Sequence, residues 1–149
     1  MSHSGHIWVA EDDPADAFFL QRAFKRAGIP VTLHFVRNGQ EAIDFLQGAG
    51  PFADRAAYPT PALLLLDLKM PRLDGFDVLS WIRKRPEYNQ LLVVLFSSVQ
   101  EPKVIQRAYS LGANWHLVKP HSMAELTELV GRFKKYWLEH GTEQGRAAA

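Results

Sequence analysis

The chain has 149 residues, of which 47% are apolar and 22% are charged, a composition typical of globular proteins, and its length predicts one domain. Because 17 Lys and Arg nearly balance 16 Asp and Glu, the net charge of +1 argues against binding to nucleic acid or to an anionic membrane. The lack of cysteine excludes disulfides, thiolate zinc sites and cysteine nucleophiles. The longest apolar run, residues 91–96, is far shorter than the ~20 residues that span a bilayer, and the sequence does not begin with a secretion signal. We therefore expect a cytoplasmic protein.

The N-terminal part of the chain predicts a strand, a helix and a second strand. Residues 7–10 form a short apolar run, which is typical of strands that are buried on both faces. Asp13 followed by Pro14 indicates the start of a helix that ends at Gly28, so we assign Asp13 to helix capping rather than to metal binding. Apolar and polar residues then alternate at residues 31–36, as they do in a strand at the edge of a sheet.

The middle of the chain predicts two helices separated by a loop and a buried strand. Asn38 lies three residues before a Glu, which is the spacing of a capping box at the start of a helix. Residues 48–61 contain two Gly and three Pro and predict a long loop. Residues 62–66 form the next apolar run, and Asp74 with Gly75 indicates the start of the following helix.

The C-terminal part predicts two more strands, each followed by a helix. The strands are the apolar runs at residues 91–96 and 115–118, which, like those at 7–10 and 62–66, predict burial on both faces. Between them, an apolar stripe of helical spacing ends before Gly112. Ser122, three residues before a Glu, begins the last helix, whose apolar stripe continues to Trp137.

Five alternating strands and helices predict an α/β fold built on a parallel sheet, because parallel strands need crossover connections. Right-handed crossovers and the edge-like second strand favour the strand order 2-1-3-4-5 with helices on both faces, which is the doubly wound, flavodoxin-like arrangement. We expect one domain over residues 1–140 with its core at about 7–137. Residues 141–149 predict a flexible tail that neither binds DNA nor catalyses a reaction.

Polar side chains that follow the strands converge at one edge of this predicted sheet, where ligands bind in open parallel sheets. Three carboxylates close together would have raised pKa values unless a cation lies among them, and hard oxygen ligands suit Mg²⁺. One carboxylate could then act as a nucleophile and form an aspartyl-phosphate, with a lysine and a hydroxyl neutralising charge around it. The residues at these positions are Glu11 and Asp12 after the first strand, Asp67 after the third, Ser97 after the fourth and Lys119 after the fifth.

Four segments resemble the receiver domains of response regulators of the chemotaxis type, in the order and at the spacing of that family. They are VAEDDP at residues 9–14, LDLKMPRLDG at 66–75, Ser97-Ser98, and LGANWHLVKP at 111–120. The EDDPAD and AYSLGAN patterns and the long loop before the third strand are more similar to small stand-alone regulators paired with phytochrome-type histidine kinases. The resemblance extends over about residues 7–137.

This resemblance implies a two-component phosphorelay in which a histidine kinase phosphorylates Asp67 with Mg²⁺ and the product changes its protein contacts. Asp12 and Asp67 would bind Mg²⁺, together with Glu11, directly or through water, and the backbone carbonyl of Lys69. Ser97 would hydrogen-bond one phosphoryl oxygen. Lys119, in a cis bond to Pro120, would neutralise another. No dedicated enzymatic domain is expected.

The sequence departs from the family at positions that matter for switching. His116 stands where the family has a Tyr or Phe that moves with Ser97, which predicts weaker or pH-sensitive coupling. Lys69 and Val99 replace smaller or polar residues and predict slow self-dephosphorylation. Near the end of the last helix there are three consecutive large apolar residues, Tyr136, Trp137 and Leu138. They predict an exposed apolar patch through which the protein forms a homodimer.

Three other functions are compatible with the same fold. An adaptor that has lost phosphorylation would not need the complete set of acidic residues, Ser97 and Lys119. A phosphatase with an aspartyl nucleophile usually has a second Asp two residues after the first, where this chain has Lys69. A nucleotide or flavin carrier would need a Gly-rich phosphate loop after the first strand, which the sequence lacks.

Overall fold

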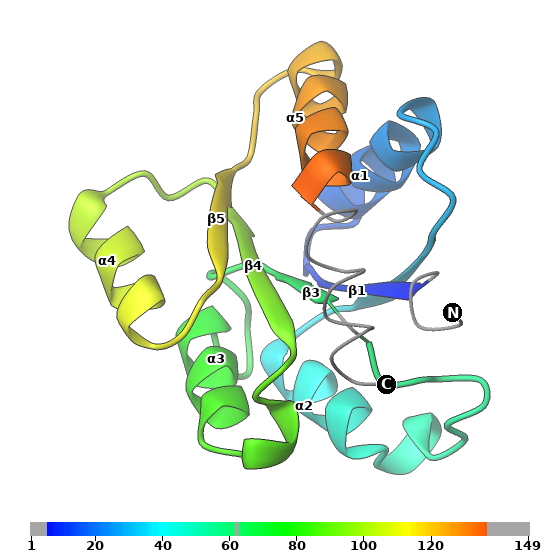
Figure 1. Ribbon diagram of the computed structural model, residues 1–149, viewed down its shortest axis with the longest axis vertical. Helices are drawn as coiled ribbons and strands as arrows, with labels where there is room; N and C mark the ends of the chain where they lie inside the picture. Colours follow the sequence, from blue (N-terminus) through cyan, green and yellow to red (C-terminus); the bar gives the residue numbers. More distant parts are fainter. Residues whose placement is uncertain (1–5, 62, 137–149) are drawn as a thin grey trace.

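A five-stranded parallel sheet with the order β2-β1-β3-β4-β5 forms the centre of the protein (Figure 1). The computed structural model describes residues 6–61 and 63–136. Each predicted strand is present within one or two residues of its expected bounds, and the predicted order and fold class are confirmed. The strands are β1 (His6–Ala10), β2 (Thr32–Val36), β3 (Leu63–Leu66), β4 (Leu92–Ser97) and β5 (Trp115–Val118).

Five helices connect and follow the strands. The residues that were predicted to cap four of them form the expected hydrogen bonds to backbone N–H groups. Asp13 accepts hydrogen bonds from the backbone N–H groups of Ala15 and Asp16, which confirms its assignment to capping. The Asn38 and Ser122 side chains accept backbone N–H groups in the same way, and Asp74 forms a reciprocal capping box with Asp77. The helices are α1 (Pro14–Arg26), α2 (Gly39–Gln47), α3 (Gly75–Arg83), α4 (Pro102–Ser110) and α5 (Met123–Tyr136).

Alternate side chains of the strands enter two cores, one on each face of the sheet. Ile7 and Val9 of β1 pack with residues of α1 and α5, whereas Trp8 and Ala10 pack with residues of α2, α3 and α4. Figure 1 shows α1 and α5 together on one side of the sheet and α2 and α3 on the other. Because all five strands are parallel, their carboxyl ends lie at the same edge of the sheet.

Contrary to the prediction, strand β5 is not buried on both faces. In this order it lies at the edge of the sheet and pairs only with β4, so Val118 keeps 36% of its surface exposed. The central strands β1, β3 and β4 agree with the prediction, because almost all of their residues are buried.

One arginine side chain attaches the predicted loop at residues 48–61 to the rest of the domain. Its chain forms a short 3-10 helix, Gly50–Phe52, and Phe52 and Tyr58 pack on the core around Trp8. The Arg55 guanidinium donates to the carbonyl oxygens of Phe45 at 2.7 Å and Leu46 at 3.1 Å at the end of α2. The loop is therefore tied to the domain rather than extended from it. A second 3-10 helix, Pro86–Tyr88, precedes β4.

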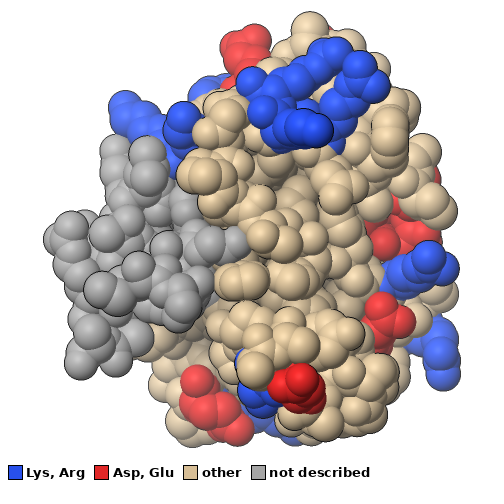
Figure 2. Space-filling model, turned by 90° about the vertical axis from the view of Figure 1, so that its right-hand side faces the viewer, with Lys and Arg blue, Asp and Glu red and all other residues tan. Residues whose placement is uncertain are grey.

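Charge is distributed unevenly although the total is near zero. Figure 2 shows Lys and Arg gathered near the top of one face, above a mostly uncharged middle. On α1, Arg22, Lys25 and Arg26 line a shallow hollow with Phe18. None of the helices that the structure describes combines the length and the hydropathy of a membrane-spanning segment. The expectation that nucleic acid is not a partner stays a prediction.

Candidate functional site

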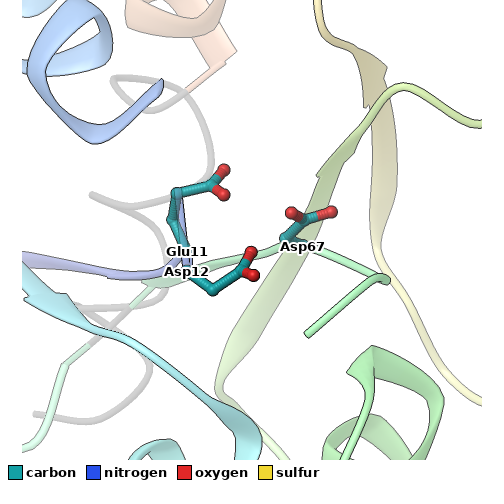
Figure 3. Close-up of side chains that lie close together, drawn as sticks. All are labelled: Glu11, Asp12 and Asp67. Carbon is teal, nitrogen blue, oxygen red and sulfur yellow. The ribbon is translucent and has the colours of Figure 1, made fainter. Parts of the chain in front are cut away.

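Three carboxylates meet at the carboxyl edge of the sheet (Figure 3). One oxygen from each of Glu11, Asp12 and Asp67 can be chosen so that all three lie within 4.8 Å of one another. Sheet hydrogen bonds fix the chain here, because the Glu11 N–H donates to Val36 O and the Asp67 N–H donates to Ala10 O. Glu11 and Asp67 are buried, and Asp12 is exposed. The predicted convergence of these residues is therefore present.

Lys119 contacts two of these carboxylates from the end of β5. Its backbone N–H donates to Ser97 O at 2.9 Å, which extends the pairing of β5 with β4. Its Nζ atom lies 2.6 Å from Glu11 Oε1 and 3.1 Å from Asp67 Oδ2. The side chain is only 14% exposed, so these ion pairs are largely shielded from water. The Lys119–Pro120 bond is trans, which corrects the expected cis bond; trans is the more stable form of an X–Pro bond, and the lysine reaches the site with it.

Burial and neighbouring charged groups shift the pKa values of Glu11 and Lys119. Burial raises the pKa of Glu11 to about 7, with a smaller effect of the Asp67 charge in the same direction and an opposing hydrogen bond from Lys119. Burial alone would lower the pKa of Lys119, but hydrogen bonds to Glu11 and Asp16 and the charge of Asp67 raise it. Lys119 is therefore a permanent cation among an excess of carboxylates.

The turn after β3 orients Asp67. The Lys69 backbone N–H donates to Asp67 Oδ1 at 3.3 Å, while Oδ2 faces Lys119. The Lys69 side chain is exposed. Gly75, at the start of α3, lies so close to the Asp67 carbonyl that a Cβ atom would be 2.5 Å from that oxygen. The helix can approach the acidic residue this closely because Gly75 has no side chain.

Ser97 ends β4, the strand next to Asp67, and is 1% exposed. Its Oγ accepts the backbone N–H of Val99 at 3.2 Å. His116 lies on β5 with a hydrogen bond to the Val99 backbone, and its Nε2 atom is buried without a hydrogen-bond partner in the described part of the chain. Burial lowers the pKa of His116, against the effect of that hydrogen bond. Both predicted switch residues therefore contact the same short segment after β4.

Asp16 belongs to this site, and the sequence reasoning missed it. Its Oδ2 lies 3.0 Å from Lys119 Nζ, and it stands in the first turn of α1, where an acidic residue also suits the helix dipole. The signal that could have found it is a further acid one helical turn after the Glu11-Asp12 pair. A cavity of about 270 Å³ opens beside Asp16 and Lys119, lined also by Phe19, Phe96 and Met123.

The arrangement can hold a divalent cation and place one carboxylate beside it as the acceptor of a phosphoryl group. Carboxylate oxygens are ligands that Mg²⁺ prefers, and an ammonium beside them can neutralise a further anion. Trp137 and Leu138 of the predicted dimer patch lie outside the described residues, as does the tail at 141–149, and the Tyr136 side chain is not described either.

Comparison with known proteins identifies the family of the chain. The family profile of the response regulator receiver domain matches residues 7–131. The solved structure of RPA3017, a response regulator in red light signaling of R. palustris, is 39% identical, with a TM-score of 0.84 over 89% of this chain and 92% of that one. The phosphorylated cyanobacterial phytochrome response regulator RcpA is 30% identical, with a TM-score of 0.82 over 90% of this chain and 94% of its own.

Rcp1 of Synechocystis sp. (strain ATCC 27184 / PCC 6803 / Kazusa) is 32% identical over 133 residues, which are 89% of this chain and 88% of Rcp1. Its Mn²⁺-bound structure has a TM-score of 0.80, at 31% identity over 91% of this chain and 95% of that one. The family profile covers most of the sequence, and these relatives match along nearly their whole length. The chain therefore belongs to the response regulator receiver domain family and is homologous to stand-alone regulators such as Rcp1 and RcpA.

Proposed function

We propose that this receiver domain accepts a phosphoryl group from a histidine kinase on Asp67 and then changes its protein contacts. Phosphorylation of an aspartate is the general mechanism of the family to which the chain belongs. The observation that carries the assignment to Asp67 is its position: a buried carboxylate 3.1 Å from Lys119 Nζ and within 4.8 Å of two further acids. A nucleophilic carboxylate beside a cation is what the transfer needs.

The donor set fits Mg²⁺, because three carboxylates from two strand ends converge and Asp12 is open to solvent. Glu11, Asp12, Asp67 and the backbone carbonyl of Lys69 would hold the ion. When bound, it would neutralise negative charge on the phosphoryl oxygens. The Mn²⁺-bound structure of the homologous Rcp1 supports a divalent cation at this site.

The protein groups around Asp67 have separate tasks in the transfer. An Asp67 oxygen attacks the phosphorus of the kinase phosphohistidine, the P–O bond forms as the P–N bond breaks, and the imidazole leaves with the electron pair. The Lys69 N–H orients Asp67 through its Oδ1 atom. Lys119 turns an N–H toward one phosphoryl oxygen, and the Ser97 hydroxyl, whose oxygen accepts the Val99 N–H, donates its own O–H to another.

The relatives support the choice of partner. RcpA is a phytochrome response regulator and RPA3017 acts in red light signaling, so we propose a phytochrome-type histidine kinase as the phosphodonor. Rcp1 matches along 88% of its own length, which supports a stand-alone regulator with one domain at residues 1–140. A homodimer through Tyr136, Trp137 and Leu138, and the cytoplasmic location, stay predictions.

Intact mass spectrometry with acetyl phosphate and Mg²⁺ tests the proposal. The protein should gain the mass of one phosphoryl group, and chelation of Mg²⁺ with EDTA should suppress the gain. Asp67→Asn should gain nothing, because it lacks the nucleophilic oxygen. Asp44→Asn removes an exposed carboxylate on α2 that contacts Gln40, and should behave like the parent.

Three results would contradict this assignment. An Asp67→Asn protein that gains the same mass would place the acceptor elsewhere. A parent that gains no mass, with beryllium fluoride also leaving its gel-filtration volume unchanged, would favour an adaptor that works without phosphorylation. Repeated hydrolysis of small phosphate esters would favour an aspartyl-nucleophile phosphatase.

A further inference from the structure

Lys119 donates to three carboxylates, and only two of them belong to the acidic cluster of the site. An ammonium group has three N–H donors. Its three acceptors are Glu11 Oε1 at 2.6 Å, Asp16 Oδ2 at 3.0 Å and Asp67 Oδ2 at 3.1 Å. All three donors are therefore in use before any phosphoryl group arrives.

Two of these three contacts must change during the proposed phosphorylation, on which this inference rests. Glu11 would hold the metal ion, and Asp67 would carry the phosphoryl group. Asp16 is outside the cluster formed by Glu11, Asp12 and Asp67, and so it has neither task. Its contact with Lys119 can persist while the other two contacts are exchanged.

The backbone of α1 holds Asp16 in place for this contact. Asp16 lies in the first turn of the helix, where its N–H donates to the capping side chain of Asp13 at 3.4 Å. Its side chain is 39% exposed, in contrast to 8% for Asp67 and 3% for Glu11. Asp16 is thus by far the most solvent-exposed of the three carboxylates that contact the lysine.

We propose that Asp16 is a positioning residue that keeps the Lys119 ammonium beside Asp67 during phosphoryl transfer. Without Asp16, Glu11 and Asp67 would be the remaining carboxylate partners of the lysine in the described part of the chain, and it would lose both of these orienting contacts when those carboxylates take up metal and phosphoryl group. With Asp16, one N–H stays anchored to α1, while the N–H groups released by Glu11 and Asp67 can reach the phosphoryl group. Asp16 acts through Lys119 and does not itself touch the acceptor.

Phosphorylation kinetics with acetyl phosphate test this in a double-mutant cycle of Asp16→Ala and Lys119→Ala. Asp16→Ala should slow phosphorylation by about tenfold, since a displaced charged group costs about that much in rate or more. Asp16→Asn keeps an oxygen acceptor and should slow it less. In the Lys119→Ala background, Asp16→Ala should have no further effect. The Mg²⁺ concentration for half-maximal rate should stay unchanged in the Asp16 variants, because Asp16 is not a ligand.

A structural role for Asp16 predicts a different pattern. Glu125→Ala removes an acidic residue from the first turn of α5 and serves as the control for the helix dipole; it should leave the rate unchanged. Equal slowing by Asp16→Ala in the parent and in the Lys119→Ala background would overturn the proposal. So would faster phosphorylation of Asp16→Ala, because Asp16 would then act only as a repulsive charge.

A spectroscopic measurement separates this inference from the proposed function. The ¹⁵N resonance of the Lys119 ammonium should be sharp in the parent and broadened by exchange with water in Asp16→Ala. If the parent takes up no phosphoryl group, the proposed function fails while this comparison still reports the contact. An ammonium resonance that does not respond to Asp16→Ala would overturn the inference even if Asp67 is phosphorylated.

Discussion

At the scale of single residues, the neighbours of Asp67 determine how long an acyl phosphate there should survive. Lys69 contributes its backbone N–H to Asp67, while its side chain is exposed. Val99 packs against the core of α2, α3 and α4, and its N–H donates to Ser97. Neither side chain has an acceptor atom that could orient an attacking water molecule.

We therefore expect slow self-dephosphorylation, and a double variant that supplies acceptors should speed it. Lys69→Asn with Val99→Glu should lose the phosphoryl group about tenfold faster than the parent, because a carboxylate near the phosphorus can act as a general base. Loss of the phosphorylated mass after removal of the phosphodonor measures the rate. Since Val99 is half-buried, Lys69→Asn alone and the thermal midpoints serve as controls. A double variant that is folded and no faster would contradict this explanation.

Most of the site could be predicted because it follows directly from strand ends. Glu11, Asp67, Ser97 and Lys119 each come next to the last residue of a short apolar run, and a parallel sheet brings such positions to one edge. Asp16 could not be found in this way, because a first-turn acid is already explained by the helix dipole. The sequence does show an acid one helical turn after Asp12, but the contact of that acid with Lys119 depends on how α1 crosses the sheet.

At the scale of elements, the approach of α3 to β3 fixes the turn that holds Asp67. The Gly75 N–H donates to Leu68 O at 2.9 Å, and the Gly75 Cα lies against the Asp67 backbone. A Cβ at Gly75 would also lie 2.7 Å from the Leu68 Cα, so both nearest obstacles are backbone atoms that cannot rotate away. The start of α3 and the acceptor residue are therefore in direct backbone contact.

Gly75→Ala should destabilise the protein by about 1–3 kcal/mol, the usual cost of overpacking, and should slow phosphorylation by displacing Asp67. Gly131→Ala is the matched control, because Gly131 lies in α5 and a Cβ atom there would have no neighbour within 4 Å in the described part of the chain. That substitution should stabilise by about 0.5–1 kcal/mol through helix propensity and leave phosphorylation unchanged. Urea unfolding measures both stabilities. Equal stability of the two variants would show that α3 can shift freely.

The elements themselves were largely predictable, and the exceptions have physical causes. Apolar runs indicated the strands because side chains of a parallel sheet are buried on both faces. The same pattern failed for β5, whose exposure follows from its position at the edge rather than from its own residues. The loop at residues 48–61 has no periodicity, and it is held by Arg55 contacts with the end of α2 that only the folded chain creates.

At the scale of the whole molecule, both edges of the sheet carry a histidine whose pKa is lowered. On β2, His34 stacks on Trp8 with ring centroids 4.6 Å apart, and its Nε2 lies 2.8 Å from His6 Nδ1. Burial lowers the pKa of His34, and the His6 charge adds to the effect. On β5, burial lowers the pKa of His116. Protonation of these histidines is therefore unfavourable in the folded state at both outer strands, β2 and β5.

This arrangement gives the stability a definite pH dependence. Because the folded-state pKa values are lowered, the unfolded chain binds more protons below its histidine pKa of about 6.5. The contribution of the two histidines to the free energy of unfolding is complete above that pH and is lost as the pH falls from there through their lowered folded-state pKa values. Protonation of Glu11, whose pKa is raised to about 7, acts in the opposite direction over the same range, so the histidine contribution is the difference between the parent and the variants in metal-free buffer. From pH 7 to pH 5, the urea midpoint of His34→Phe with His116→Phe should fall less, or rise more, than that of the parent, since Phe keeps the ring on Trp8 but cannot titrate. His34→Phe alone should lie between them, and a double variant whose midpoint changes by the same amount as that of the parent would show that the two histidines do not contribute.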